Sequence, residues 1–217
     1  MKLYVYDHCP YCVKARMIFG IKNLDFDLVT LLNDDEQTPI SMVGVKMVPI
    51  LEKQTGKYMP ESMDIVYYID ANYGKQKVIE AKNNSEIADW LDQSRDYLYN
   101  LAMPRWVKSD LEEFKTNASV NYFIKKKENY IGSFEENLAD SPRLINMANN
   151  HLQQLEQILT NNDYLKENKI TEDDVHLFAI LRSLSIVKGL KYPEKVDKYR
   201  KSLSTLSKIN LHDNIAL

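Results

Sequence analysis

The stretch that decides the fold lies at the start of the chain, where Lys2-Leu3-Tyr4-Val5-Tyr6 is followed, after Asp7 and His8, by Cys9-Pro10-Tyr11-Cys12. The first run alternates in the manner of a β-strand, and a helical pattern begins at Val13. Cys9 and Cys12 are the only cysteines of the chain. A Cys-X-X-Cys motif between a strand and a helix brings its two sulfurs within disulfide reach and is typical of a redox dithiol.

A metal site is the competing interpretation of the same motif. Structural zinc requires four ligands, usually from a second Cys-X-X-Cys or from two histidines at close spacing. The four histidines of this chain are scattered singly, at positions 8, 151, 176 and 212. The motif therefore favours redox chemistry, and no metal ligand is predicted.

The two cysteines are not expected to be equivalent. Proline is favoured at the first helical position, because its missing N–H has no partner there, so Pro10 predicts Cys9 as the N-cap. The free N–H groups and the positive end of the helix dipole then favour a thiolate at Cys9. Cys9 is predicted to be the nucleophile, and Cys12, one turn further in, to resolve a mixed disulfide and form the redox-active disulfide with Cys9.

Composition places the chain among ordinary globular proteins. Its 217 residues are 44% hydrophobic and 27% charged, with a formal net charge of −3. This balance predicts no nucleic-acid or membrane partner, and the cluster Lys125-Lys126-Lys127 is interpreted as a solvated helix face. No apolar run reaches the roughly 18 residues needed to span a bilayer, and no signal peptide precedes the first strand. We expect a cytoplasmic protein, in which two free thiols are more readily catalytic than structural.

The chain divides into two parts by pattern. Residues 1–73 predict a βαβ unit followed by ββα, residues 74–84 a polar linker, and residues 85–217 an all-helical domain. The predicted strands are 3–6, 26–31, 48–51 and 57–59, and the predicted helices of the first part are 10–21, 38–43 and 61–71. On the first helix, Val13, Met17 and Ile21 form an apolar stripe that is expected to pack on the sheet.

The second part carries helical patterns alone. One helix is outlined from Ile87 to Leu101, which Pro104 is expected to kink or end, and another from Leu144 to Leu159. Further helical segments are predicted near 120–130, 174–187 and 194–206. The run Thr171-Glu172-Asp173-Asp174 resembles a capping box with Asp in place of Glu.

Longer motifs resemble a known family. The string Tyr6-Asp7-His8-Cys9-Pro10-Tyr11-Cys12 is similar to the glutaredoxin 2 family, as are Leu31-Leu32-Asn33-Asp34-Asp35, Val48-Pro49-Ile50-Leu51 and Tyr58-Met59-Pro60-Glu61-Ser62. The resemblance implies a thioredoxin-like α/β domain with a mixed four-stranded sheet, joined to an all-α domain in a glutathione-transferase-like architecture. It also implies a glutathione-dependent thiol-disulfide oxidoreductase that reduces glutathione mixed disulfides and protein disulfides.

The resemblance also implies a binding site for glutathione, which would be a co-substrate and not a permanently bound cofactor. Val48-Pro49 would be a cis-proline step whose Val48 backbone pairs with the cysteinyl part of glutathione. Glu61 and Ser62 would begin a helix that holds the γ-glutamyl group. Tyr11 would lie against the tripeptide or pack within the turn.

Other roles are left open by the sequence. Arg16 and Lys46 are equal candidates for holding the glycine carboxylate of glutathione. His8 is expected to tune the local field or to fill a hydrogen-bonding position, since a thiolate at a helix N-terminus needs no base. His176 is expected to be a surface or half-buried residue without a chemical role. The expected partners are glutathione and glutathionylated or disulfide-bonded proteins, and the chain is expected to be a monomer.

Three other functions compete with this reading. A glutathione transferase with an active-site cysteine would usually lack Cys12, and a non-enzymatic transferase-like interaction protein would commonly lack both cysteines. A dimer bridged by an iron–sulfur cluster is disfavoured because Pro10 and Tyr11 occupy the turn. The intact dithiol therefore favours the oxidoreductase.

Overall fold

The computed structural model describes residues 1–74, 76–81, 84–161 and 170–217. Its N-terminal part contains one sheet of four strands, β1 (Lys2–Val5), β2 (Asp27–Thr30), β3 (Ile50–Gln54) and β4 (Lys57–Met59). The strand order is β2-β1-β3-β4. β1 pairs in parallel with β2 and antiparallel with β3, and β3 pairs antiparallel with β4. This confirms the mixed four-stranded sheet of a thioredoxin-like domain.

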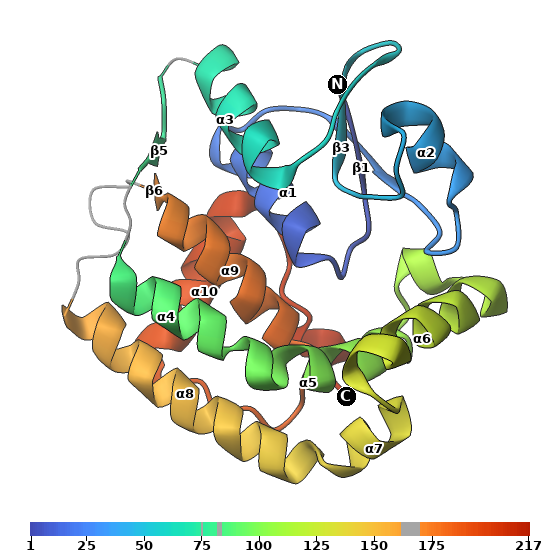
Figure 1. Ribbon diagram of the computed structural model, residues 1–217. Coiled ribbons are helices and arrows are strands. Elements are labelled where there is room, and N and C mark those ends of the chain that lie inside the picture. Colours follow the sequence, from blue (N-terminus) through green and yellow to red (C-terminus); the bar gives the residue numbers. More distant parts are fainter. Residues whose placement is uncertain (75, 82–83, 162–169) are drawn as a thin grey trace.

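Three helices accompany the sheet: α1 (Pro10–Ile21), α2 (Gln37–Val43) and α3 (Ser62–Asn72). Figure 1 shows α1 and α3 together on one side of the sheet and α2 on the other. A buried ion pair joins the end of α1 to α3, with 2.8 Å between Lys22 Nζ and Asp70 Oδ1. The same carboxylate accepts hydrogen bonds from the N–H groups of Val78 and Ile79, which holds part of the predicted linker against the sheet domain.

Helices make up most of the C-terminal part. They are α4 (Ser85–Gln93), α5 (Arg95–Trp106), α6 (Asn117–Ile131), α7 (Phe134–Ala139), α8 (Ser141–Asn161), α9 (Glu172–Leu184) and α10 (Glu194–Ser207), with 3₁₀ turns η1 (Glu112–Phe114) and η3 (Asp213–Ile215). The capping box predicted at the start of α9 is present, because Thr171 and Asp174 each accept a hydrogen bond from the other's backbone N–H. No described helix has the length and apolar character needed to cross a membrane.

The helical part departs from the sequence expectation in local detail. The helix predicted from Ile87 onward does not end at Pro104. It is interrupted instead at Ser94, whose hydroxyl donates a hydrogen bond to the Leu91 carbonyl, and α5 continues to Trp106. Two short strands, β5 (Ile79–Glu80) and β6 (Ile170–Thr171), pair in parallel, although two-residue strands leave no readable period in a sequence. Residues 75, 82 and 83 of the predicted linker lie outside the described residues, and the domain boundaries at 73 and 85 stay a prediction.

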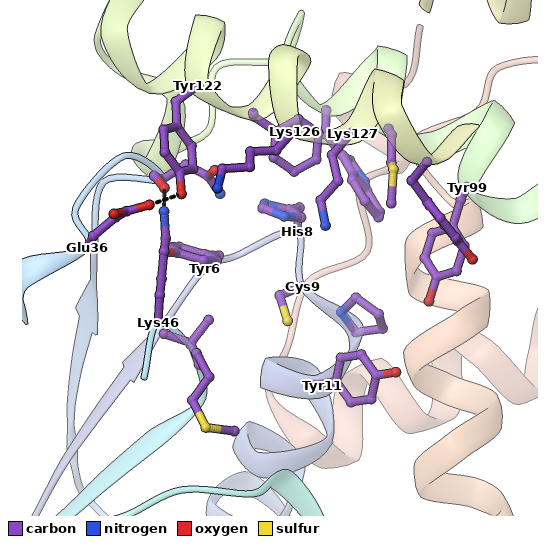
Figure 2. A pocket seen from close by; sticks show the side chains of 18 residues that line it. Tyr6, His8, Cys9, Tyr11, Glu36, Lys46, Tyr99, Tyr122, Lys126 and Lys127 are labelled. Carbon is purple, nitrogen blue, oxygen red and sulfur yellow. Dashed lines mark hydrogen bonds between the residues drawn. The ribbon is translucent and has the colours of Figure 1, made fainter. Parts of the chain in front are cut away.

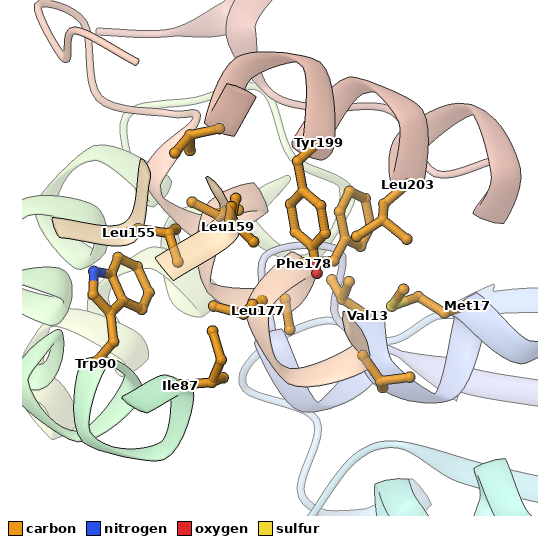
Figure 3. Close-up of a cluster of buried hydrophobic side chains, with 14 of the residues drawn as sticks. Val13, Met17, Ile87, Trp90, Leu155, Leu159, Leu177, Phe178, Tyr199 and Leu203 are labelled. Atoms are coloured by element: carbon orange, nitrogen blue, oxygen red, sulfur yellow. The ribbon is translucent and has the colours of Figure 1, made fainter. Parts of the chain in front are cut away.

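Helix α1 is buried on two faces, and this corrects one expectation. Val13 and Met17 do not pack on the sheet but join Leu177 and Phe178 of α9 and Leu203 of α10 in a core of the helical part (Figure 3). The sheet is covered by the other face of α1, which carries Cys12, Ala15, Ile18 and Phe19. The stripe was assigned to the wrong neighbour because a helix between two layers is apolar on both sides, and period alone does not say which layer each side meets.

Candidate active site

The dithiol sits at the first turn of α1, as the sequence predicts. Cys9 is the N-cap of the helix with extended backbone (φ −70°, ψ 119°), and Pro10 is the first helical residue. The Cys12 N–H donates to Cys9 Sγ at 3.4 Å, and the Tyr6 N–H donates to Cys12 Sγ at the same distance. Both thiols are free and buried, Cys12 completely so.

The two sulfurs have opposite electrostatic environments. A hydrogen bond from the Cys12 thiol, the charge of His8 and backbone N–H donors together lower the pKa of Cys9 to about 7, although burial opposes them. Burial raises the pKa of Cys12 well above its usual value, and the neighbouring Cys9 raises it further. Cys9 is therefore the sulfur that ionises near neutral pH, and Cys12 remains a thiol that donates to it.

His8 is anchored by a carboxylate from the helical part. Glu113 Oε1 lies 2.6 Å from His8 Nδ1 and also accepts the His8 backbone N–H at 2.9 Å. Glu113 is fully buried on η1, and the hydrogen bond from His8 keeps the pKa of Glu113 below its usual value although burial alone would raise it. The imidazole lies among the rings of Tyr6, Trp106, Phe114 and Phe123. This fits the expectation that His8 fills a hydrogen-bonding position and tunes the field at Cys9.

Asp7 ties the same segment to the end of the chain. Its carboxylate accepts from Arg182 Nη2 at 2.8 Å and from Arg16 Nη1 at 2.6 Å, and His212 Nε2 lies 2.9 Å away. Burial would raise the pKa of Asp7, but the hydrogen bond from His212 and the two guanidinium groups hold it far below its usual value. Asp7 and His8, the two residues directly before Cys9, are thus both held by side chains from the helical part.

The residues that the family resemblance assigns to glutathione lie on the sheet domain, around the start of β3 and the start of α3 and at Tyr11. The Val48-Pro49 peptide bond is cis, as expected. Neither the N–H nor the C=O of Val48 is hydrogen-bonded to another described residue. α3 begins at Ser62, as expected within one residue, and Glu61 is its N-cap with φ of +70°, a conformation uncommon outside glycine. Ser62 is 7% exposed, and its hydroxyl has no hydrogen-bond partner among the described residues.

A cavity of about 560 Å³ opens in front of Cys9, between the two parts of the chain (Figure 2). The sheet domain contributes Tyr6, His8, Cys9, Pro10, Tyr11, Asn33, Glu36, Lys46, Met47 and Val48. The helical part contributes Tyr99, Met103, Trp106, Tyr122, Phe123, Lys126, Lys127 and Tyr130. Tyr11 is 54% exposed, so its ring is free to contact a bound molecule. Pro49, Glu61, Ser62 and the fully buried Cys12 are not part of this lining.

The two candidate cations for the glycine carboxylate, Lys46 and Arg16, have different positions in the structure. Lys46 lines the cavity, with its Nζ 3.7 Å from the centre of the Tyr122 ring. Arg16 does not line it and is committed to Asp7. His176 is half-buried and lines a smaller cavity on the other side of Tyr11.

The lysine triplet of α6 is solvated, as expected, but two of its members also belong to the site. Lys125 and Lys126 are exposed and Lys127 is half-buried. Lys126 and Lys127 line the cavity that contains Cys9, and Lys125 lies outside that lining (Figure 2). Successive positions on a helix point in different directions, so only packing of α6 over the dithiol decides which lysines face the site.

Several site residues gave no usable signal in the sequence. Glu113 stands in a polar run that is 105 residues from His8 along the chain. Tyr122 donates a hydrogen bond to Glu36 from the opposite wall of the cavity, and these two residues are 86 positions apart. Contacts of this kind arise from the docking of the helical part on the sheet domain, which no local pattern encodes.

Comparisons with known proteins agree with this geometry. A family model described as "Glutaredoxin 2, C terminal domain" matches residues 86–216, and one described as "Glutathione S-transferase, N-terminal domain" matches residues 3–77. Glutaredoxin 2 of Escherichia coli K12 is 44% identical over 217 residues, which is the whole length of both chains.

Solved structures extend the comparison. The crystal structure of Salmonella typhimurium glutaredoxin 2 in complex with glutathione matches with a TM-score of 0.93 and 46% identity, covering 100% of this chain and 98% of that one. A glutathione transferase from Phanerochaete chrysosporium matches with a TM-score of 0.68 at 16% identity, covering 94% of this chain and 96% of that one. The second match shows a shared fold alone.

The thioredoxin-like sheet, the dithiol at the start of α1 and the docked helical part define a thiol-disulfide oxidoreductase built on the glutathione-transferase plan. The chain belongs to the glutaredoxin 2 family. It is a glutathione-dependent enzyme, and the transferase alternative is the weaker reading.

Proposed function

We propose that Cys9 is the nucleophile of this glutaredoxin and Cys12 its resolving thiol. The observation that carries the assignment is the position of the Cys9 sulfur, which caps α1, lines the cavity and has a pKa lowered to about 7. Cys12 is completely buried behind it and is the weaker acid. A thiolate is the attacking species in disulfide exchange, so the difference in acidity decides which sulfur acts first.

The reaction on a glutathione mixed disulfide proceeds in two exchanges. The Cys9 thiolate attacks the glutathione sulfur, the disulfide bond breaks, and the substrate leaves as a thiolate that takes up a proton. Cys9 is then joined to glutathione. A second glutathione attacks the glutathione sulfur of that adduct, which releases oxidised glutathione and restores the Cys9 thiolate.

A protein disulfide follows a different second step. Cys9 first bonds to one substrate sulfur, and the other substrate sulfur leaves as a thiolate that takes up a proton. The Cys12 thiol then gives up its proton and attacks Cys9 Sγ. The substrate leaves fully reduced, and a Cys9–Cys12 disulfide remains, which two molecules of glutathione reduce in turn.

Glutathione would bind along the backbone just before β3 and at the start of α3. The free N–H and C=O groups of Val48, next to cis-Pro49, would pair with the cysteinyl residue in the manner of an added strand. The unpartnered Ser62 hydroxyl and the N-terminus of α3 would hold the γ-glutamyl carboxylate, and Glu61 its amine. Lys46 would hold the glycine carboxylate, because Arg16 is already paired with Asp7. Tyr11 would contact the tripeptide with its exposed ring.

The proposed location is the cytoplasm, where a reduced glutathione pool is available to regenerate the dithiol. The proposed protein partners are glutathionylated and disulfide-bonded proteins. Glutathione acts as co-substrate in this scheme, with no permanently bound cofactor.

Cys9→Ser and Cys12→Ser test the assignment. We expect Cys9→Ser to abolish exchange on every substrate. Cys12→Ser should keep a substantial part of the activity on glutathione mixed disulfides and lose reduction of protein disulfides, because only the second reaction needs a resolving thiol. Both activities are followed through glutathione reductase and NADPH. An active Cys9 variant, or a Cys12 variant inactive on both substrates, would show that the roles are wrong.

A further inference from the structure

The cavity in front of Cys9 has a charge opposite to that of the whole chain. Its lining contains Lys46, Lys126 and Lys127, and Glu36 is its only carboxylate. That carboxylate already accepts a hydrogen bond from the Tyr122 hydroxyl. The chain as a whole has a formal net charge of −3. A positive cavity in a negative protein favours negatively charged ligands and raises their rate of encounter.

The lysines of α6 are free to bind such a ligand. Lys126 Nζ lies 5.3 Å from the centre of the Tyr122 ring, and Lys127 Nζ lies 5.7 Å from that of Phe123. Neither forms an ion pair with any carboxylate in the described parts of the chain. Figure 2 shows Lys127 reaching from α6 toward Cys9, whereas Lys126 extends toward Tyr122.

A second cavity lies on the other side of Tyr11. Its volume is about 260 Å³, and it shares Pro10, Tyr11 and Tyr99 with the first. Its lining contains no carboxylate and includes Lys14, Arg95 and His176. Arg95 forms an exposed ion pair with Asp92, and burial lowers the pKa of His176 to about 4, so that imidazole is neutral at pH 7. Selection by charge therefore depends on the lysines of the first cavity.

The proposed mechanism leaves part of the cavity to the other half of a mixed disulfide. The cysteinyl and γ-glutamyl parts of glutathione would lie along Val48 and α3, and the glycine carboxylate at Lys46, which shares the Tyr122 ring with Lys126. Sulfur substitution is in line, so the thiol that leaves must lie on the far side of the glutathione sulfur from Cys9. The space that remains for it in the cavity is bounded by Lys127 and Tyr130 of α6 and by Tyr99 of α5.

We infer that Lys126 and Lys127 select glutathionylated proteins whose modified cysteine lies in an acidic segment. The inference rests on the proposed function and adds the substrate class: a polypeptide with Asp or Glu within a few residues of the disulfide. The aromatic side chains of Tyr99, Tyr122 and Tyr130 offer apolar contact between the charged contacts.

The test uses two glutathionylated peptides that differ only in the residues flanking cysteine, two Glu on each side in one and two Lys in the other. The wild-type enzyme should turn over the acidic peptide with a kcat/KM about tenfold higher than that of the basic one, and the ratio should shrink as salt is added. Lys126→Glu and Lys127→Glu should each lower the ratio about threefold to tenfold, the range expected when an exposed ion pair is lost and its sign reversed.

Lys125→Glu is the matched control, because it makes the same charge change on the same helix but lies outside the cavity lining. It should change the ratio by less than half as much as the other two variants. Equal changes in all three would mean that only the overall field matters and would overturn the inference. So would a raised KM for glutathione in the Lys126 and Lys127 variants with an unchanged peptide ratio, since those lysines would then hold glutathione itself.

Failure of the inference is distinguishable from failure of the proposed function. If the wild-type enzyme turned over neither peptide, the proposed dithiol mechanism would be wrong. Equal turnover of the acidic and basic peptides would leave that mechanism intact and remove the selection by charge.

Discussion

At the Cys9 sulfur, burial and hydrogen bonding act in opposite directions, and hydrogen bonding prevails. Removal from water disfavours a thiolate, yet the Cys12 thiol, the His8 charge and the first N–H groups of α1 lower the pKa of Cys9 to about 7. About half of the Cys9 thiols are then ionised at pH 7, which is near the optimum for an attacking thiol. Three residues downstream, Cys12 experiences the same burial without an N-cap position, and its pKa rises.

Substitution of His8 should weaken the acidity of Cys9. His8→Gln removes the imidazole whose electrostatic interaction helps to lower the pKa of Cys9, so that pKa should rise by about one unit, equivalent to about 1.4 kcal/mol. The thiolate fraction at pH 7 would fall from about a half to about a tenth. The rate of alkylation by iodoacetamide, measured as a function of pH, gives the pKa directly.

His176→Gln serves as the control for that experiment. It removes another imidazole, which is half-buried and lines the smaller cavity beside Tyr11. Its pH profile should match that of the wild type. If His8→Gln left the profile unchanged, the field of the imidazole would have no part in the acidity of Cys9.

Substitution of Ser62 should weaken the binding of glutathione and leave the acidity of Cys9 unchanged. Ser62→Ala removes one hydrogen bond to a charged carboxylate, worth on the order of 1.5 to 3 kcal/mol. The KM for glutathione should therefore rise about tenfold or somewhat more. The alkylation profile of Cys9 should stay the same, because Ser62 belongs to α3 and Cys9 to α1.

The matched control is Ser41→Ala on α2, where an exposed hydroxyl donates only to the Thr38 carbonyl. Its steady-state kinetics should equal those of the wild type. An unchanged KM in Ser62→Ala would mean that the γ-glutamyl carboxylate is held elsewhere.

Among the elements, α1 carries both the dithiol and the junction between the two parts of the chain. Its sheet face and its α9 face are both apolar, and a third contact is made through Gly20. A Cβ built on Gly20 would lie 1.8 Å from the backbone oxygen of Ser207 in α10. No real contact is that short, so the glycine allows α10 to approach α1 closely.

For Gly20→Ala, helix propensity and packing against α10 predict opposite changes in the free energy of unfolding. Helix propensity alone predicts a gain of about 1 kcal/mol in the free energy of unfolding. The backbone of α10 would have to move, and overpacking of this kind typically costs about 1–3 kcal/mol, so we expect net destabilisation. Urea denaturation followed by circular dichroism measures the sign, and a more stable variant would show that α1 and α10 are not closely packed.

At the scale of the whole molecule, the helical part completes the active site. Glu113 holds His8, Arg182 and His212 hold Asp7, and α6 forms the far wall of the cavity. Figure 1 shows the sheet domain seated on the helical part, with the start of α1 at the junction. The reactive turn is thus buttressed by groups that are far away in the sequence.

Asp7→Asn should loosen this junction. Arg182 is nearly fully buried, and loss of its carboxylate partner leaves a buried charge with carbonyl acceptors alone, at a cost of about 3 kcal/mol in the free energy of unfolding. Asp197→Asn is the control, because Asp197 forms a partly exposed pair on α10 and should cost at most about 1 kcal/mol.

The pH dependence of that difference has a definite sign. The folded pKa of Asp7 is depressed, so its contribution to stability is complete above the unfolded value of about 3.9 and is lost as pH falls toward the folded value. The difference in stability between wild type and Asp7→Asn should be constant from about pH 5 to pH 7 and should shrink below about pH 4. A constant difference down to pH 2 would exclude the ionised carboxylate as its source.

Features that arise from neighbouring residues could be predicted from the sequence alone. The N-cap at Cys9, the helix start at Pro10 and the capping box at Thr171 were predicted from spacing and local chemistry. The family resemblance implied the mixed sheet, the cis bond before Pro49 and the start of α3. Hydrogen bonds within one turn and the periods of strands and helices are properties of short segments, so a short segment of sequence predicts them.

Only the tertiary structure decided which faces meet. The stripe of Val13 and Met17 is plain in the sequence, yet its partner is α9 and not the sheet, since both layers offer apolar surface. The lysine triplet is equally plain, but packing of α6 turned Lys126 and Lys127 to the cavity and left Lys125 outside it. Glu113 reaches His8 across 105 positions of the chain, because domain docking brings together side chains that no local period relates.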